Sequence, residues 1–449
     1  MVKEGMNTRK QIRFFSMMVL IMLFGGSILM RDRMAAAGSI QPAEALPPQT
    51  IDGNAALASF CAAHGSGNGS AINPFIIENK QITASGTGNC FFLNNTNAHV
   101  TFRNCTFYMS GVSTLDWDAG IKVNNCSHVR ISGCTIHDNL IGISVMSSSL
   151  VSLVSNNISF SSAYSIMLDH LNSTTIQGNR VWNSTGWGIY LTVSTNNTII
   201  SNTVTNCTAQ AAIGLNFGVD NNTVDGNTLQ SNEFGIYIQM SKLNVIQFNN
   251  VTRNHRGVAI MNSDNNSVIA NNISLNIGGD TGGIIVGSGD NNSIIGNDVS
   301  NNGPYGIRLS IPSVGNIIYL NRFANNEVLE GALQSPSRRS PAARSITLSD
   351  SSTNAWDNGT LGNYWGNYTA VYPTATNNGT TWNTPYEIAD LNMYEANQTD
   401  NHPLVNWPYI PPSTPPALPG YDVALMLAGI SVALCVLILQ KLRFKKIQH

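Results

Sequence analysis

The chain has 449 residues, of which 11% are charged, and its formal net charge is −2 at pH 7. A chain this weakly charged lacks the basic patch that nucleic-acid binding requires, so we exclude a nucleic-acid partner. It also carries many N-x-S/T sequons, which agree with a glycosylated protein outside the cell.

The first 37 residues have the layout of an export signal. An apolar run covers residues 14–30, and residues 35–38 (Ala-Ala-Ala-Gly) resemble a cleavage site. Four basic residues precede the run: Lys3, Arg9, Lys10 and Arg13. We predict a signal peptide over residues 1–37. An uncleaved signal anchor is the alternative, because the apolar run is about 17 residues long.

A unit of about 23 residues recurs from Phe91 to Phe323, after residues 38–90, which we assign to an N-terminal cap and first coil. Each unit has an apolar pair spaced by two, from Phe91/Leu93 to Ile307/Leu309, and two further apolar columns. Residues two apart share one face of a strand, and the unit is too short for a strand and a crossover helix. A fixed period is typical of a solenoid. We therefore predict an all-β, parallel solenoid of about ten or eleven coils, with repeats over residues 91–326.

An asparagine column follows the third apolar column in eight of these units. It comprises Asn156, Asn179, Asn202, Asn227, Asn249, Asn271, Asn297 and Asn321, and Cys105 and Cys134 take the same position on two earlier coils. A buried amide needs hydrogen-bond partners, and equivalent amides on neighbouring coils provide them. The column therefore predicts an internal asparagine ladder.

These units resemble the right-handed parallel β-helix of the pectate-lyase-like group, and more narrowly the NosD-like β-helix proteins of archaeal surfaces. The resemblance is carried by Gly-Ile units such as Gly142-Ile143 and Gly188-Ile189 and by the asparagine column. A second signature runs from Trp356-Asp357-Asn358-Gly359 to Asp400-Asn401-His402-Pro403-Leu404 and is similar to the C-terminal cap of that group. The resemblance implies a single-stranded right-handed β-helix with a cap over residues 346–407. It implies no particular activity, because one fold hosts many functions.

The remaining segments predict a membrane anchor. Residues 327–345 interrupt the repeat and contain three arginines, so we interpret them as an inserted loop, either a solvated insertion or a basic partner-binding loop. A proline-rich stalk covers residues 408–421. An apolar stretch over residues 422–440 predicts a transmembrane helix, and the basic tail 441–449 belongs on the cytoplasmic side. We expect a single-pass cell-membrane protein with an extracellular solenoid.

Acidic residues are scarce where β-helix enzymes carry their chemistry. Of the two outward columns of the first strand, only Asp169 is acidic, and glycoside hydrolysis needs two carboxylates. His170, Asp116 and Asp118 are further catalytic candidates. Aromatic residues are better organised, and they are candidates for stacking on sugar rings: Tyr164, Trp187, Tyr190, Phe234, Tyr237 and Tyr305. Turn packing between coils is the alternative role for these rings.

Three further kinds of site follow from column positions. His99 and His128 share one column on adjacent coils and are candidate metal ligands, although two imidazoles alone make a poor site. Cys105 and Cys134 are one coil apart, within disulfide range. Four sequons at one outward coil position predict glycosylation at Asn196, Asn221, Asn265 and Asn291.

Together these patterns predict a non-catalytic surface protein that binds glycans or another cell-surface component and needs no cofactor. One alternative is a polysaccharide lyase, hydrolase or epimerase that acts on the outer face of the first sheet. A second alternative, implied by the NosD resemblance, is a copper-maturation factor.

Overall fold

The computed structural model describes residues 43–278, 282–310, 313–326, 346–348, 354–388 and 398–407. The predicted signal peptide, inserted loop, stalk, transmembrane helix and basic tail lie outside these residues. Within the described part of the chain, no helix is both long and apolar enough to cross a membrane. The chain divides into two units, Met1–Glu44 and Ala45–His449, and the second contains the solenoid.

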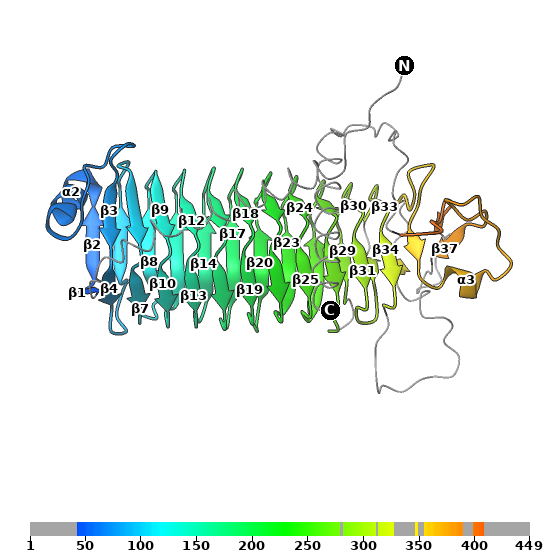
Figure 1. Cartoon of the computed structure of the whole chain (residues 1–449), viewed down its shortest axis with the longest axis horizontal. Helices are drawn as coiled ribbons and strands as arrows, with labels where there is room; N and C mark the ends of the chain where they lie inside the picture. Colours follow the sequence, from blue (N-terminus) through cyan, green and yellow to red (C-terminus); the bar gives the residue numbers. More distant parts are fainter. Residues whose placement is uncertain are drawn as a thin grey trace, which may run out of the picture. The chain divides into compact units, whose positions relative to one another are not determined.

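Three parallel sheets run along the solenoid, and each coil adds one strand to each sheet (Figure 1). The first sheet has 12 strands and carries the apolar pairs. Its strands are β2 (Gln49–Asp52), β5 (Phe91–Asn94), β8 (Ala119–Asn124), β11 (Ile141–Met146), β14 (Tyr164–Asp169), β17 (Trp187–Thr192), β20 (Ala211–Asn216), β23 (Phe234–Gln239), β26 (Arg256–Met261), β29 (Ile284–Gly287), β32 (Ile307–Ser310) and β35 (Ile346–Leu348).

The second sheet has 11 strands and carries the third apolar column. Its strands are β3 (Phe75–Glu78), β6 (Val100–Arg103), β9 (Val129–Ser132), β12 (Ser152–Val154), β15 (Thr175–Gln177), β18 (Thr198–Ile200), β21 (Thr223–Asp225), β24 (Val245–Gln247), β27 (Ser267–Ile269), β30 (Ser293–Ile295) and β33 (Ile317–Tyr319). The predicted solenoid of about ten or eleven coils is therefore confirmed.

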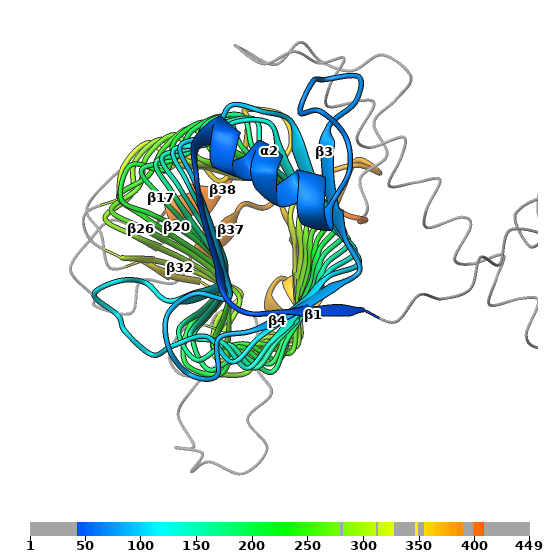
Figure 2. The ribbon, with the colours of Figure 1, turned by 90° about the vertical axis from the view of Figure 1, so that its left-hand side faces the viewer.

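The third sheet has 13 strands and carries the fourth apolar column. Its strands are β1 (Glu44–Leu46), β4 (Lys80–Thr83), β7 (Thr106–Tyr108), β10 (Thr135–His137), β13 (Asn157–Ser159), β16 (Arg180–Trp182), β19 (Thr203–Thr205), β22 (Thr228–Gln230), β25 (Asn250–Thr252), β28 (Asn272–Ser274), β31 (Asp298–Ser300), β34 (Arg322–Ala324) and β36 (Tyr364–Trp365). Viewed along the axis, the coils superimpose and enclose one core (Figure 2).

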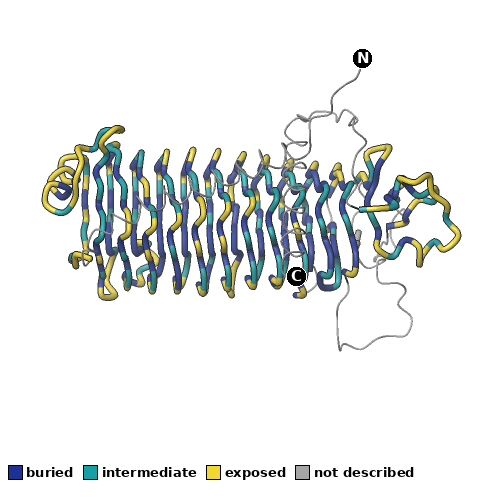
Figure 3. The backbone as a smooth tube through the Cα atoms, viewed as in Figure 1, coloured by how far each residue is buried: buried dark blue, intermediate teal, exposed yellow. Residues whose placement is uncertain are grey.

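The apolar columns form that core, because side chains of a strand alternate between the inside and the outside of a coil. Ile143, Leu153 and Ile158, which belong to one coil, are all fully buried, and their equivalents on neighbouring coils pair with them in register. Buried positions therefore recur along every coil (Figure 3). The N-terminal end of the core is covered by α2 (Gly53–His64), whose Phe60 packs edge-on against Phe91 at 5.6 Å between ring centroids.

The predicted asparagine ladder is confirmed. Asn227, for example, is fully buried, and its Oδ1 accepts hydrogen bonds from the backbone N and the Nδ2 of Asn202 at 2.8 and 3.0 Å. Its Nδ2 donates to the Oδ1 of Asn249 at 2.9 Å and to the carbonyl of Ile199 at 2.9 Å. Each amide thus joins three coils and satisfies backbone groups at the turn from the second to the third sheet.

Two further buried ladders occupy the other turns, and the sequence analysis missed both. One precedes the second sheet and the other follows the third sheet, with the same amide-to-amide bonds. They comprise Asn197, Asn222, Asn244, Asn266, Asn292, Asn316 and Asn354, and Asn232, Asn254, Asn276, Asn302 and Asn326. A signal was present, because these asparagines also recur once per unit beside the apolar columns.

The C-terminal end of the core is closed by stacked aromatic rings. Trp365 lies between Phe323 and Tyr386, with ring centroids 4.9 and 4.3 Å away and nearly parallel planes. This end also contains the short helix α3 (Tyr368–Val371) and an antiparallel pair, β37 (Tyr386–Ile388) and β38 (Gln398–Asp400). The ladder of the second-to-third turn ends here at Asn363, whose backbone N donates to the buried carboxylate of Asp400 at 2.7 Å.

Candidate functional site

The outer face of the first sheet presents two rows of side chains that run along the solenoid. Parallel pairing in register places each row, because equivalent residues of adjacent coils face each other. The first row runs Lys122, Ser144, Met167, Tyr190, Gly214, Tyr237 and Ala259. The second row runs Asn124, Met146, Asp169, Thr192, Asn216, Gln239 and Met261. These rows match the outward columns expected from the sequence.

Six aromatic rings form a continuous strip on this face, which we call the aromatic ribbon: Trp117, Tyr164, Trp187, Tyr190, Phe234 and Tyr237. Successive ring centroids are 6.0 Å apart for Trp117 and Tyr164, 5.2 Å for Tyr164 and Tyr190, and 4.9 Å for Tyr190 and Trp187. Trp187 then lies 6.2 Å from Tyr237, which lies 5.1 Å from Phe234. All six are half-buried, so each ring has one part packed and another part open to solvent.

Gly214 makes room for the ribbon. A Cβ atom at this position would lie 2.4 Å from Cζ3 of Trp187, so the indole lies directly over the backbone of β20. Burial raises the pKa of the Tyr164, Tyr190 and Tyr237 hydroxyls, which stay protonated as hydrogen-bond donors at neutral pH. The Tyr190 hydroxyl also interacts with the side chains of Thr192 and Asn216 in the second row.

The structure brings together five of the six predicted aromatic residues. Tyr305 is the exception: it precedes β32, several coils beyond Phe234, and it is half-buried. Ala211 pairs with Phe234 and Arg256 follows on the next coil, so non-aromatic residues interrupt this turn column. Trp117 was not among the predicted aromatics because it lies in an irregular loop outside the repeat. Its role depends on how that loop folds back toward Tyr164.

The catalytic candidates fall into two groups on different strands. Asp169 on β14 pairs with His170, with 2.7 Å between Oδ1 and Nδ1. Asp116 and Asp118 lie in the loop before β8 and hold Ser113, whose hydroxyl donates to Asp116 at 2.9 Å and whose backbone N donates to Asp118 at 3.0 Å. Strand β11 lies between β8 and β14. The arrangement therefore offers one carboxylate–imidazole pair on β14 and, two strands away, two loop carboxylates that are both engaged by Ser113.

Lys122 interacts with the two acidic residues of the loop before β8 rather than with Asp169. Its Nζ donates to the backbone carbonyl of Asp116, and the negative charges of Asp116 and Asp118 favour its protonated form. Burial nevertheless lowers the pKa of Lys122. This lysine therefore joins the loop to the first sheet and is not free to meet a ligand.

The two metal candidates stack on each other. The rings of His99 and His128 have centroids 4.1 Å apart and planes inclined by 31°, so they lie side by side on adjacent coils as expected. Nδ1 of His128 also contacts the hydroxyl of Ser127 at 3.1 Å. Across the described residues, no group of three or more His, Cys, Asp and Glu side chains is placed to hold a metal ion. Stacked imidazoles do not converge on a common point, so this pair does not fit a metal site by itself.

Cys105 and Cys134 lie next to each other, as their columns predict. Both are buried free thiols in this structure and hydrogen-bond to each other, so the disulfide between them remains a prediction. The hydrogen bond and burial raise the pKa of Cys134 far above its usual range. The four predicted glycosylation sites, Asn196, Asn221, Asn265 and Asn291, are all exposed. Each is followed directly by a buried asparagine of the ladder before the second sheet.

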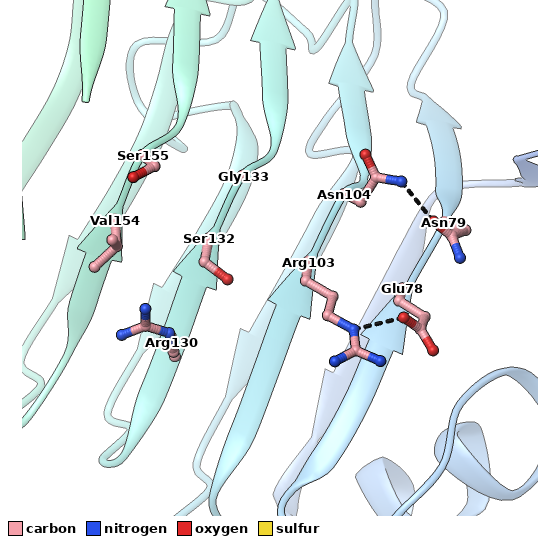
Figure 4. A pocket seen from close by; sticks show the side chains of 9 residues that line it. All are labelled: Glu78, Asn79, Arg103, Asn104, Arg130, Ser132, Gly133, Val154 and Ser155. Carbon is pink, nitrogen blue, oxygen red and sulfur yellow. Dashed lines mark hydrogen bonds and ion pairs between the residues drawn. The ribbon is translucent and has the colours of Figure 1, made fainter. Parts of the chain in front are cut away.

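A shallow depression of about 460 Å³ lies elsewhere, on the second sheet (Figure 4). Two of its three charged groups pair with each other: Arg103 donates to Glu78 at 2.5 Å, and this bond lowers the pKa of Glu78. Arg130 donates to Ser152 at 3.2 Å. The depression is lined by Glu78, Asn79, Arg103, Asn104, Arg130, Ser132, Gly133, Val154 and Ser155. It therefore has weaker support as a ligand site than the aromatic ribbon.

Comparison with known proteins agrees with the solenoid. A family model described as "right handed beta helix region" matches residues 89–240, and one described as "periplasmic copper-binding protein (NosD)" matches residues 213–397. The A-module of mannuronan C-5 epimerase AlgE6 from Azotobacter vinelandii has a similar structure, with a TM-score of 0.50 and 14% identity over 71% of this chain and 93% of that one. At this identity the likeness is one of fold.

Two further solved structures are similar at lower scores. The periplasmic alginate epimerase AlgG has 12% identity over 64% of this chain and 85% of its own, with a TM-score of 0.41. The enzymatically active domain of bacteriophage CBA120 tailspike protein 2 has 12% identity over 76% of this chain and 56% of its own, with a TM-score of 0.44. No protein of curated function matches the sequence. The three-sheet solenoid and the two family matches identify the chain as a right-handed parallel β-helix repeat protein of the pectate-lyase-like superfamily.

Proposed function

We propose that this chain is a membrane-anchored extracellular protein that binds carbohydrate on the outer face of its first sheet, without cleaving it. The observation that carries the proposal is the aromatic ribbon, in which six rings contact one another along the solenoid and stay partly open to solvent. Aromatic faces pack against the apolar C–H faces of sugar rings, and rigid rings lose little conformational entropy on binding. Exposed apolar strips of this kind mark binding surfaces.

The arrangement of Trp187 supports a binding role over simple turn packing. Turn packing needs no glycine beside the ring, whereas the Trp187 ring occupies the space that a side chain at residue 214 would fill. Rings that only fill gaps between coils would be fully buried, and these are half-buried.

An enzyme is the competing function, and one observation favours it. Asp169 and His170 form a carboxylate–imidazole pair beside Tyr190, and a general base of this kind is what proton abstraction from a sugar requires. The fold is also that of a mannuronan C-5 epimerase A-module. The pair lacks a second carboxylate facing it among the described candidates, and we therefore place binding before catalysis.

A copper role, suggested by the NosD name, has less support. The pair His99 and His128 supplies two imidazoles, and no third His, Cys, Asp or Glu among the described residues is placed to complete a metal site with them. The cysteines point into the core, while the histidines lie on the turn. These residues do not fit a copper site, so we assign no step to copper.

The binding proposal is tested with the full-length protein and immobilised polysaccharides. Replacing Trp187 and Tyr237 with alanine should weaken retention strongly, because these two neighbouring rings connect Tyr190 to Phe234. Trp182→Ala is the matched control, since Trp182 is also half-buried but lies on the third sheet, packed on Phe160 at 5.1 Å. Retention that is unchanged in the double variant would exclude the ribbon as the binding surface. Turnover of any polysaccharide that disappears in Asp169→Asn would instead establish the enzyme.

The location is tested separately, by adding protease to intact cells. Charge asymmetry around the predicted span places the basic tail in the cytoplasm and the solenoid outside. We expect the solenoid to be digested while a small C-terminal fragment stays with the membrane. A solenoid that is protected until the membrane is opened would contradict the surface assignment.

A further inference from the structure

The turn that follows each strand of the first sheet contains one residue in the left-handed region. On most coils this residue is of a type that tolerates positive φ: Asn95, Asn125, Ser147, His170, Asn262 and Ser288. Three consecutive coils depart from this pattern, with Val193 at φ +46°, Phe217 at +62° and Met240 at +48°. We call these three residues the apolar ridge.

The ridge is unfavourable for folding in two ways. A β-branched or bulky side chain at positive φ is strained, because its Cβ approaches the backbone carbonyl. The three side chains also remain 46%, 47% and 51% exposed, so the strain is not offset by burial. Asparagine serves the same turn on coils to either side, which shows that the turn itself does not require an apolar residue. Exposed left-handed apolar residues also occur singly on other turns, such as Phe160 and Leu243, but the ridge places them on three consecutive coils beside the ribbon.

A row of polar side chains lies between the ridge and the aromatic ribbon. Each ridge residue directly follows one residue of the second outward row: Thr192, Asn216 and Gln239. Asn216 is only 4% exposed and interacts with the Tyr190 hydroxyl of the ribbon, whereas Thr192 and Gln239 are half-buried. The face of β17, β20 and β23 therefore has three parallel strips, which are aromatic, polar and apolar.

The charges that flank the aromatic ribbon are paired. Asp169 pairs with His170 at 2.7 Å, and Glu233 pairs with Arg256 at 2.6 Å and with His255 at 2.9 Å. Within the two outward rows of β14, β17, β20, β23 and β26, no lysine or arginine is present, and the exposed Lys242 lies outside these rows, two residues beyond Met240. A uronate or sulfate on these rows would therefore lose its hydration without meeting a cation of the rows, which disfavours anionic sugars.

We infer that the three strips bind an uncharged polysaccharide chain that lies along the solenoid axis across β17, β20 and β23. Sugar rings stack on the ribbon, sugar hydroxyls bond to the half-buried Thr192 and Gln239 of the polar row, and the ridge covers the opposite apolar edge of the chain. Coils repeat about every 4.8 Å along the axis, which allows successive sugars to meet equivalent positions. This inference rests on the proposed carbohydrate binding and adds the charge class of the ligand and the second wall of its site.

The ridge is tested by replacing Phe217 and Met240 with asparagine in the full-length protein. Because asparagine tolerates positive φ, the double variant should melt at the same temperature as the unmodified protein or higher, while its Kd for an uncharged glycan rises about tenfold or more. Phe248→Asn is the matched control: Phe248 is also left-handed, at φ +54°, but follows β24 on the turn between the second and third sheets. It should change the melting temperature alone. Unchanged affinity in F217N/M240N would overturn the role of the ridge.

The charge class is tested with soluble glucomannan, galactomannan and laminarin against alginate and polygalacturonate, at low and high salt. We expect binding to at least one uncharged polymer with an affinity that salt leaves nearly unchanged. Binding to alginate or polygalacturonate alone, with strong salt dependence, would overturn this inference and leave the proposed carbohydrate binding intact. Loss of binding in Trp187→Ala together with full binding in F217N/M240N would have the same consequence. No binding to any of the five polymers would contradict both proposals.

Discussion

The N-terminal coils and the later coils share their apolar columns but differ at the turns between their sheets, which we call corners. Before the second sheet, the early coils place the buried side chains Val100, Val129 and Val151 where the later coils place asparagine from Asn197 onward. Before the third sheet, Cys105 and Cys134 occupy the position that asparagine holds from Asn156 onward. The two regions therefore close one core with different chemistry.

The difference concerns how buried backbone groups at the corners find partners. In the later coils, each ladder amide binds a backbone N and a backbone carbonyl of the preceding coil, so the side chain completes the turn. In the early coils, the backbone N of Val100 donates directly to the carbonyl of His128 at 3.1 Å. The early turns before the second and third sheets thus depend more on apolar volume, and the equivalent later turns depend on specific hydrogen bonds.

The largest effect that this comparison predicts is at Asn227. Asn227→Leu removes an amide with partners on both neighbouring coils and leaves the Asn202 backbone N and the Ile199 carbonyl without theirs. We expect the free energy of unfolding to fall by about 4 kcal/mol, as several buried groups lose partners at about 1–3 kcal/mol each. Urea unfolding measures this change. Cys134→Leu at the same column of an early coil is the control and should cost less; an equal loss would break the comparison.

The next effect is a pH dependence at the C-terminal end of the ladder, where Asp400 takes the place of a further amide. Burial raises the pKa of Asp400 to about 7, although Asn363, Trp365 and His402 all donate hydrogen bonds to it. The unfolded chain releases this proton near pH 4. The folded state therefore retains the proton in the window between these values, and the stability that protonation contributes is present at pH 4 and is lost as the pH rises to about 7.

We expect the free energy of unfolding to decrease by up to about 1.4 kcal/mol per pH unit within that window. Thermal melts between pH 4 and 7 measure it. Asp357 does not mask the effect, because its pKa is lowered and its own contribution is lost only below its ordinary range. Asp400→Asn cannot titrate and should remove the slope; a variant that keeps the slope would show that another group causes it.

The smallest effect is a gain in the early coils. Cys134→Asn should extend the ladder by one coil, because the new amide can donate to Oδ1 of Asn156, which already accepts from the backbone N of residue 134. We expect about 1 kcal/mol of added stability under reducing conditions, from one new buried hydrogen bond. Cys134→Ser, whose side chain is shorter, is the control. A loss of stability in Cys134→Asn would mean that the early corners accept only compact side chains.

The sequence by itself determined the coil. A period of about 23 residues, with apolar pairs spaced by two, leaves one way to bury those columns, which is to stack the coils in register. The same register predicted that Tyr190 and Tyr237 share an outward row and that Asn202, Asn227 and Asn249 form a ladder. The other two ladders were equally periodic. In the ladder before the second sheet, Asn197 and Asn222 are the middle residues of the sequons that begin at Asn196 and Asn221, so the sequence analysis assigned them to sequons and not to a ladder.

Tertiary structure alone decided the features that the repeat does not encode. Trp117 joins the ribbon because an irregular loop returns to the first sheet, and Trp187 packs over the backbone of β20 because Gly214, on the next coil, has no side chain. The left-handed conformation of Phe217 follows from the hydrogen bonds of the turn, since its backbone N donates to the carbonyl of Gln239 at 2.9 Å. Periodicity specifies which positions are equivalent. The path of a loop and the strain of a backbone depend instead on contacts between residues that do not recur in the repeat. These residues come into contact only when the coils are stacked.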